Sequence, residues 1–308
     1  MIKSPYIFEI EVTNLCNAKC VFCYNRNLKR ERGFIDVVKL EKFVKEVYNE
    51  NKNNWFYNNI KPAKYPKFVL GGLGEPLLHP QIFEIIKIIK KYGFVVELIT
   101  NGIKLNKVIA TNLINSKLDF LSISLHSLNP EVYKSITQVD VEIVKNNLNE
   151  ALTCLNNSEI KVSLWRVYPP VGFKRDNEND QKIYDDFVNS YKIYEVLGPS
   201  EPWERDGVVE NSVCEPIKDK YFWCHKILYT FNIDCFGNAV MCAVDYNRET
   251  VNLGNVFEDG YKKCQQNKLD ILSSEKPLIC KKCKRWSDGE LENILKTNNL
   301  EVKFYEEN

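Results

Sequence analysis

Three cysteines lie close together near the start of the chain, and their spacing has the clearest chemical meaning in the sequence. Cys16, Cys20 and Cys23 form a Cys-x3-Cys-x2-Cys motif directly after a strand-like run over 6–12. Three thiolates on a short loop can hold three corners of a [4Fe–4S] cube and leave the fourth iron without a protein ligand. A metal with an open position is the kind that does chemistry. A zinc site with a distant fourth ligand and chance spacing are the alternatives.

A second group of thiols lies in the last third of the chain and comprises Cys224, Cys242, Cys280 and Cys283. Strand-like runs over 229–234 and 238–241 flank a Phe-Gly turn and predict a β-hairpin. A hairpin brings the outer ends of its strands together, so Cys224 and Cys242 can bind one metal, which the Cys-x2-Cys pair completes. Four thiolates suit a zinc ion or an iron–sulfur cluster, and the spacing alone leaves both open.

Composition narrows the classes of function. The chain has 308 residues, 44% of them hydrophobic and 27% charged, with a net charge of +1. No basic stripe points to nucleic acid, and the short run 29–32 (Lys-Arg-Glu-Arg) is interpreted as a solvated turn. The sequence has neither a signal-peptide core nor an apolar run long enough for a bilayer, so we expect a cytoplasmic protein without membrane contact. Eleven cysteines in a reducing compartment favour metal or cluster ligation over disulfides.

Strands and helices alternate from residue 6 to about 197, and these elements must position the thiols. The expected strands are 6–12, 67–70, 95–99, 120–125, 161–167 and 193–197. The expected helices, marked by apolar residues three and four apart, are 37–48, 81–91, 106–114, 141–155 and 181–191. The alternation predicts an α/β fold with a parallel sheet and right-handed crossovers. Such sheets carry their chemistry at the carboxyl ends of the strands.

Polar and glycine-rich residues follow the later strands. They are Gly71-Gly72-Leu73-Gly74-Glu75 after the second strand, Asn101 after the third, and Ser122, Ser124 and His126 at alternate positions of the fourth. Together with the three-cysteine motif, they resemble the radical S-adenosylmethionine (SAM) superfamily. The resemblance implies a partial (β/α)6 TIM-like barrel. It also implies a [4Fe–4S] cluster on the first three thiols, whose fourth iron is bound by the methionine part of S-adenosyl-L-methionine.

The resemblance further implies which residues contact SAM. In the family a Gly-Gly-Glu segment binds the amino group of the methionine, and this chain keeps Gly74 and Glu75 but has Leu73 in place of the first Gly. The predicted SAM-binding residues are Phe22, Gly72, Gly74, Glu75, Asn101, Ser122, Ser124 and Arg166. For Arg166, an ion pair at a domain interface is the alternative. For His126, the alternative is a buried structural histidine.

The second thiol group resembles the Twitch extension of the SPASM/Twitch enzymes in this superfamily, as does the segment 253–256 (Leu-Gly-Asn-Val). The resemblance implies one auxiliary [4Fe–4S] cluster on Cys224, Cys242, Cys280 and Cys283, because no cysteine follows the last of these. We therefore expect a barrel domain over 1–197, a linker over 198–220, a Twitch domain over 221–286, and a C-terminal helix and tail over 287–308.

The activity that the resemblance implies is reductive cleavage of SAM with an electron from a flavodoxin- or ferredoxin-type donor, followed by removal of a hydrogen atom from the substrate. We expect oxidation or epimerisation of a small polar molecule such as a sugar or cyclitol. Cys235 and His126 are the candidate catalytic residues; Cys235 could return a hydrogen atom to a substrate radical, and packing in the hairpin is its simpler role. Modification of a peptide is one alternative. A non-catalytic iron–sulfur carrier or a zinc-stabilised binding module is the alternative of another class.

Overall fold

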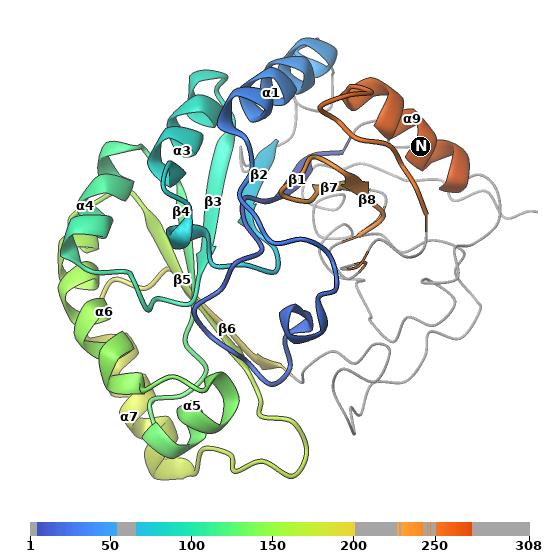
Figure 1. Ribbon diagram of the computed structural model, residues 1–308. Helices are drawn as coiled ribbons and strands as arrows, with labels where there is room; N and C mark the ends of the chain where they lie inside the picture. The colour runs from blue at the N-terminus through green and yellow to red at the C-terminus, as the bar shows by residue number, and fades with distance from the viewer. Residues whose placement is uncertain are drawn as a thin grey trace, which may run out of the picture.

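One eight-stranded sheet organises the molecule (Figure 1). The computed structural model describes residues 5–53, 66–200, 227, 229–242, 245, 247 and 251–272. The strand order is β6-β5-β4-β3-β2-β1-β7-β8, and β1 to β6 pair in parallel with their neighbours in the chain. These six strands are β1 (Ile7–Glu11), β2 (Lys67–Gly71), β3 (Val95–Thr100), β4 (Phe120–Ser124), β5 (Lys161–Val167) and β6 (Glu195–Ser200). The predicted parallel α/β sheet is confirmed, consistent with a partial TIM-like barrel.

Helices cover one face of this sheet (Figure 1). They are α1 (Val37–Asn51), α3 (Ile82–Lys91), α4 (Lys107–Asn115), α5 (Pro130–Thr137), α6 (Val141–Leu155), α7 (Glu178–Asn189) and α9 (Tyr261–Leu272), with 3-10 turns η1 (Tyr24–Asn27) and η2 (Pro76–Leu78). The sequence missed α5, a short helix with Asn129 as its N-cap and Pro130 in its first turn. The cap and the proline are the local signals that could have found it.

Alternation along the strands separates an apolar face from a polar one. Phe8, Ile10 and Leu98 point toward the helices and belong to the buried core. The opposite side, called the inner face below, carries charged and hydroxyl side chains among apolar ones. Glu97 there accepts from Lys67 Nζ at 2.7 Å and from Ser122 Oγ at 2.6 Å. A polar inner face is what a site for polar ligands requires.

The predicted hairpin is present and continues the main sheet. β7 (Thr230–Ile233) pairs antiparallel with β8 (Ala239–Val240) and parallel with β1. α9 follows, packs against α1 and contains Cys264. The predicted linker over 198–220 lies largely outside the described residues, and the predicted C-terminal helix and tail over 287–308 lie wholly outside them. The predicted domain boundaries therefore stay predictions.

Candidate active site

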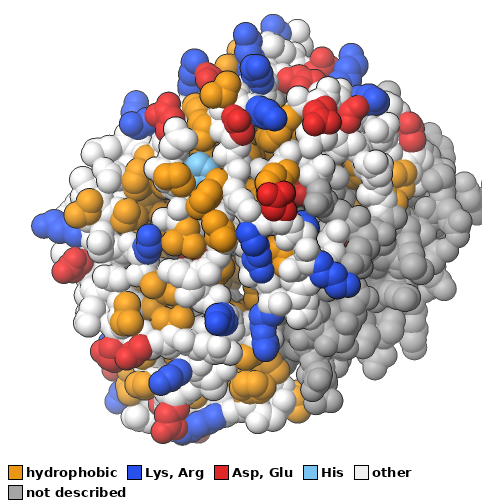
Figure 2. All heavy atoms as spheres, viewed as in Figure 1, with side chains coloured by type: hydrophobic (Ala, Val, Ile, Leu, Met, Phe, Trp, Pro, Cys, Tyr) orange, Lys and Arg blue, Asp and Glu red, His pale blue; other side chains and the backbone are white. Residues whose placement is uncertain are grey.

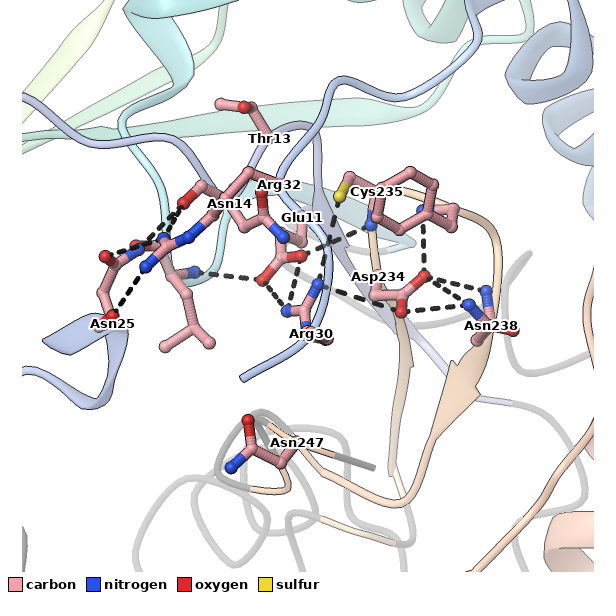
Figure 3. A network of polar contacts seen from close by, with 12 residues as sticks. Glu11, Thr13, Asn14, Asn25, Arg30, Arg32, Asp234, Cys235, Asn238 and Asn247 are labelled. Carbon is pink, nitrogen blue, oxygen red and sulfur yellow. Dashed lines mark hydrogen bonds and ion pairs between the residues drawn. The ribbon is translucent and has the colours of Figure 1, made fainter. Parts of the chain in front are cut away.

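The loop over 13–34 carries the three thiols, and hydrogen bonds from side chains near its two ends hold these ends together (Figure 3). Thr13 forms an isolated bridge with Phe34, and its Oγ1 donates to the Gly33 carbonyl at 2.7 Å. Asn14, which is fully buried, accepts from Gly33 N at 2.9 Å and donates to the Glu31 carbonyl at 2.8 Å. The thiols therefore lie in a loop whose ends are held together. Lys and Arg side chains gather over this loop on the face shown in Figure 2.

The short helix α5 supports the same loop through backbone hydrogen bonds. The backbone N–H groups of Lys19 and Val21 donate to the carbonyls of Thr137 and Ile136, at 3.1 and 2.8 Å. These carbonyls belong to the last turn of α5, where a helix leaves its C=O groups without intrahelical partners. The loop and the helix end thus satisfy one another, and α5 positions the middle of the thiol motif.

The three thiols have surroundings that suit metal ligands. Cys16 Sγ lies 3.5 Å from Ala18 N and 3.8 Å from Asn101 Nδ2, and Cys23 Sγ lies 3.4 Å from Asn25 N, so both sulfurs receive N–H donors. Burial, with a smaller contribution from the neighbouring thiols, raises the pKa of Cys20 to about 12. A bound cation would favour the thiolate form instead.

The donor set suits an iron–sulfur cluster. Among the residues that the structure describes, no three His, Cys, Asp or Glu side chains are grouped closely enough to hold one metal ion. Three thiols with N–H donors at two of them are the chemistry that such a cluster takes.

The turn after β2 packs directly against the thiol loop. A Cβ on Gly74 would lie 2.1 Å from the Thr13 carbonyl oxygen, so only glycine fits there. The next residue, Glu75, donates its backbone N–H to the Leu15 carbonyl at 2.8 Å. Gly72 has a φ of +93° and lies against Glu11, which also requires glycine. Two loops far apart in the sequence are thereby held together at the carboxyl ends of β1 and β2.

Glu75 is buried and holds the turns after β2 and β3 in place. Its carboxylate accepts from Thr100 Oγ1 and Asn101 N, both at 2.7 Å, and from Leu77 N at 3.0 Å. Burial raises the pKa of this carboxyl, while the three donors oppose the shift. The predicted residues Gly74, Glu75 and Asn101 therefore lie beside Cys16.

The end of β4 brings a further pair of predicted residues to the thiol loop. The ring of His126 contacts Phe22 edge to face, with centroids 5.2 Å apart. Val167 N lies 3.3 Å from His126 Nδ1, an arrangement in which this nitrogen accepts. Burial, with the nearby Arg166 guanidinium, lowers the pKa of His126 to about 4, so the ring is neutral at pH 7. Ser124 lies half-buried on the inner face at the end of β4.

Arg166 points to the helix side of the sheet. Its guanidinium donates to Asp176 at 2.9 Å and to Gln181 at 2.8 Å, and it lies over the Tyr184 ring at 3.9 Å. These contacts favour the alternative that Arg166 forms an ion pair within the protein over the predicted contact with SAM. Its neighbour Trp165 lies on the inner face, opposite Ser124 in the strand pairing, with 38% of its surface exposed.

A buried ion cluster joins the thiol loop to the hairpin (Figure 3). Arg30 Nη2 lies 2.7 Å from both carboxylate oxygens of Glu11, and Arg30 Nη1 lies 3.9 Å from Asp234. The Arg30 side chain is 6% exposed, so the interpretation of the run 29–32 as a solvated turn is wrong for this residue. A carboxylate at the end of a strand, Glu11, was the signal that could have indicated a buried partner.

Cys235 lies in the hairpin turn and belongs to the hydrophobic core, with 1% of its surface exposed. Its Sγ is 4.0 Å from Arg30 Nη1, and its backbone N–H lies 3.4 Å from Glu11. Burial and the nearby Glu11 and Asp234 carboxylates raise its pKa to about 12. Cys242 lies just after β8, whereas Cys224, Cys280 and Cys283 lie outside the described residues.

Comparison with known proteins places this site in a family context. The model of the Radical SAM superfamily matches residues 10–187. A protein named GTP 3',8-cyclase from Limosilactobacillus fermentum is 26% identical over 299 residues, which are 91% of this chain and 79% of that protein. A probable GTP 3',8-cyclase from Thermococcus kodakarensis is 32% identical over 163 residues, 51% of this chain. That match spans 47% of the relative, and several further curated relatives are likewise matched over about half their length.

Solved structures share the fold at low sequence identity. BtrN in complex with AdoMet and 2-DOIA has a TM-score of 0.55 at 15% identity, covering 92% of this chain and 89% of that one. Streptococcus suis SuiB bound to precursor peptide SuiA has a TM-score of 0.58 at 12% identity, covering 92% and 71%. Native anSMEcpe with bound AdoMet has a TM-score of 0.60 at 18% identity, covering 86% and 82%. Within the described part of the chain, no helix has the length and apolar character to cross a membrane.

Proposed function

Because the chain belongs to the radical SAM superfamily, we propose that it binds a [4Fe–4S] cluster through Cys16, Cys20 and Cys23, and SAM beside Glu75 and Asn101. When bound, the cluster and SAM supply an electron and a 5′-deoxyadenosyl radical that removes a hydrogen atom from a substrate carbon. The observation that carries the proposal is the contact of the thiol loop with the turn after β2 through Gly74. Iron and sulfide analysis and SAM cleavage under dithionite test it; zinc without cleavage would overturn it.

Glu75 is the residue that we propose for the ammonium of SAM. An ionised carboxylate offers about four lone-pair sites. Three are used by the protein donors Thr100 Oγ1, Asn101 N and Leu77 N. About one site is then left for a ligand donor, on a carboxylate that the protein already holds in position. Orientation of the methionine part of SAM is the expected role, with no proton transfer.

The inner face suits a small polar substrate such as a sugar or cyclitol. Trp165 offers a flat apolar surface there, and Ser124 lies next to it on β4. A ring with an apolar side and hydroxyl groups at its rim complements such a surface. We therefore propose oxidation or epimerisation of a molecule of this kind.

The choice between the two reactions depends on Cys235. Its raised pKa keeps the S–H bond intact near neutral pH, and S–H is the form that can donate a hydrogen atom. In epimerisation, the substrate would lose one hydrogen atom to the adenosyl radical and gain another from Cys235. The sulfur radical would then need an electron and a proton from the external donor. In oxidation, the substrate radical would instead lose a proton to solvent and an electron to the auxiliary cluster that we propose below.

Turnover in deuterated solvent separates these outcomes. Solvent deuterium at a substrate carbon that disappears in Cys235→Ala supports epimerisation, and a product two mass units lighter supports oxidation. Cys264→Ala is the matched control, because Cys264 is equally buried but lies in α9. If sugars give only uncoupled SAM cleavage and a peptide gives product, the small-molecule proposal is wrong and the peptide alternative replaces it.

GTP is a second candidate substrate, because a relative named GTP 3',8-cyclase matches 91% of this chain. A triphosphate needs cations that are available to it. Among the described inner-face residues, Lys67 is paired with Glu97, and the nearby Arg30 is paired with Glu11. These two cations already have carboxylate partners, and a sugar or cyclitol stays our first candidate. A cyclised guanine nucleotide formed from GTP would reverse that order.

We also propose the auxiliary [4Fe–4S] cluster on Cys224, Cys242, Cys280 and Cys283. Support comes from β8, which ends directly before Met241 and Cys242 and so brings this cysteine to the end of the hairpin. Two clusters predict about eight iron atoms per chain, and Cys242→Ala should lower this to about four. An unchanged iron content in that variant would exclude Cys242 as a ligand.

A further inference from the structure

A single side chain links the two ends of the segment that carries the thiols (Figure 3). Asn14 precedes Cys16 by two residues, and Asn25 follows Cys23 by two residues. Arg32 Nη1 donates to the Asn14 carbonyl at 2.6 Å, and Arg32 Nη2 donates to the Asn25 carbonyl at 3.0 Å. Its guanidinium therefore spans the gap that separates the start of the thiol segment from its end.

Asn25 strengthens this closure and extends it to the next turn. Its Nδ2 donates to the Asn14 carbonyl at 2.9 Å and to the Leu73 carbonyl at 2.6 Å, and its Oδ1 accepts from Arg32 Nη1 at 2.9 Å. The Asn14 carbonyl has two lone pairs, and Arg32 and Asn25 each use one. The thiol segment is thus closed on itself and tied to the loop that carries Gly74 and Glu75.

Arg32 also brings charge to the thiols. Its guanidinium contacts the backbone carbonyls of the residues two positions before Cys16 and two positions after Cys23. A positive charge at this position favours any state with more negative charge on the sulfurs and on a metal centre that they hold. The same side chain thus combines a geometric and an electrostatic effect.

We propose that Arg32 is a positioning residue for the cluster site, which closes the thiol segment and raises the reduction potential of the centre held there. The inference rests on the proposed function, since it concerns the cluster on Cys16, Cys20 and Cys23. Lysine cannot replace arginine in closing the segment, because its compact ammonium lacks the planar guanidinium fork that contacts two separate carbonyls. Lysine retains the charge, so the two parts can be separated.

The test compares Arg32→Lys, Arg32→Gln and Lys19→Gln, each reconstituted anaerobically in the full chain. Iron release to a chelator and the midpoint potential, followed by electron paramagnetic resonance, are the readouts. Loss of a residue that orients metal ligands typically costs about 10- to 100-fold in metal affinity. We expect about tenfold faster iron release in both Arg32 variants and wild-type release in Lys19→Gln, which removes an exposed charge from the same loop.

The potential isolates the role of the charge. We expect Arg32→Gln to shift the midpoint to a more negative value by about 59 mV, equivalent to a tenfold change for a one-electron couple. Arg32→Lys should stay near the wild-type potential. Lys19→Gln should shift the potential less than Arg32→Gln, because hydrogen bonds to the Asn14 and Asn25 carbonyls hold the Arg32 guanidinium at the thiol segment.

Several results would overturn the inference. Wild-type iron release in both Arg32 variants would exclude loop closure, and equal potentials in Arg32→Gln and Lys19→Gln would exclude the electrostatic part. If Arg32→Gln fails to fold, as judged by circular dichroism, Arg32→Lys still tests closure and Asn25→Ala replaces it as the second variant. A wild-type chain that takes up no iron would instead overturn the proposed function.

Discussion

Gly74 lies between the two loops that form the site, and its missing side chain is what lets them meet. We predict that Gly74→Ala lowers the free energy of unfolding by about 1–3 kcal/mol, the usual cost of forcing extra volume into a packed site. Its Cβ would lie 2.1 Å from the Thr13 carbonyl oxygen, a backbone atom that cannot move aside by changing rotamer.

Gly71→Ala is the matched control, because its Cβ would meet Ile99 at an ordinary distance of 3.5 Å. Urea unfolding of both variants measures the difference, and SAM cleavage should fall only in Gly74→Ala. Equal unfolding free energies for the two variants would show that close approach at Gly74 does not matter.

His126 should make stability depend on pH in the acid range. Its pKa is about 4 in the folded chain, below the ordinary value of 6.5, because burial and Arg166 disfavour the charged ring. Between these values the unfolded chain binds the proton and the folded chain does not, so stability rises with pH and levels off above about 6.5. The full change in the free energy of unfolding is about 3 kcal/mol.

Substitution isolates this effect from the other titrating groups. We predict that the stability difference between wild type and His126→Gln changes by about 3 kcal/mol between pH 4 and pH 7. Urea titrations at a series of pH values measure this difference in the free energy of unfolding. The variant His79→Gln, at a second buried histidine whose pKa is also lowered, serves as the comparison. A pH-independent difference for His126→Gln would contradict the prediction.

At the scale of elements, the end of α5 supports the thiol loop through a strained residue. Gln138 caps this helix in the left-handed conformation with φ +60°, which glycine adopts without steric cost. We predict that Gln138→Gly raises the free energy of unfolding by up to about 1 kcal/mol. The larger conformational entropy that glycine gives the unfolded chain reduces this gain.

Lys117→Gly provides the comparison, since Lys117 has φ +59° but lies at the other end of the sheet, after α4. Both variants should raise the thermal midpoint, and only Gln138→Gly should alter hydrogen exchange at Lys19 N and Val21 N, which donate to the α5 carbonyls. A lower midpoint in both variants would refute the strain argument.

The strands and most helices could be predicted because their apolar periodicity is local. α6 has the predicted bounds, Val141–Leu155, and β5 has the predicted bounds, Lys161–Val167. α5 was missed because eight residues give too few turns for a clear period. Local patterns predict elements well where one face of the element is buried over several turns.

Side-chain partners that lie far apart in the sequence could not be predicted in the same way. Arg30 looked like part of a solvated charge run, and only the fold brings Glu11 and Asp234 to it. Arg166 looked available for SAM, and only the placement of α7 supplies Gln181 next to it. The closeness of the three thiols could be predicted because one short loop contains them all.

At the scale of the whole molecule, the hairpin is joined to the barrel through β1 and through an aromatic cluster. Phe231 on β7 packs against Phe8 and Phe43 with ring centroids 6.3 Å away in each case, and against Tyr261 of α9 at 5.2 Å. These contacts join β1, α1 and the C-terminal part of the chain in one core. The barrel and the hairpin should therefore lose stability together.

We predict that Phe231→Ala lowers the free energy of unfolding by about 3–5 kcal/mol, as expected for deletion of a buried aromatic ring. Hydrogen exchange read by mass spectrometry should then rise in β1, β2 and β3 as well as in β7. Phe173→Ala is the control, because Phe173 is 40% exposed and its loss should leave exchange unchanged. If the hairpin folded as an independent unit, exchange in Phe231→Ala would rise over 229–242 and 251–272 alone. We expect the wider rise because β7 pairs with β1 in the same sheet. The exchange measurement therefore tests whether unfolding of the hairpin and unfolding of the barrel strands are coupled.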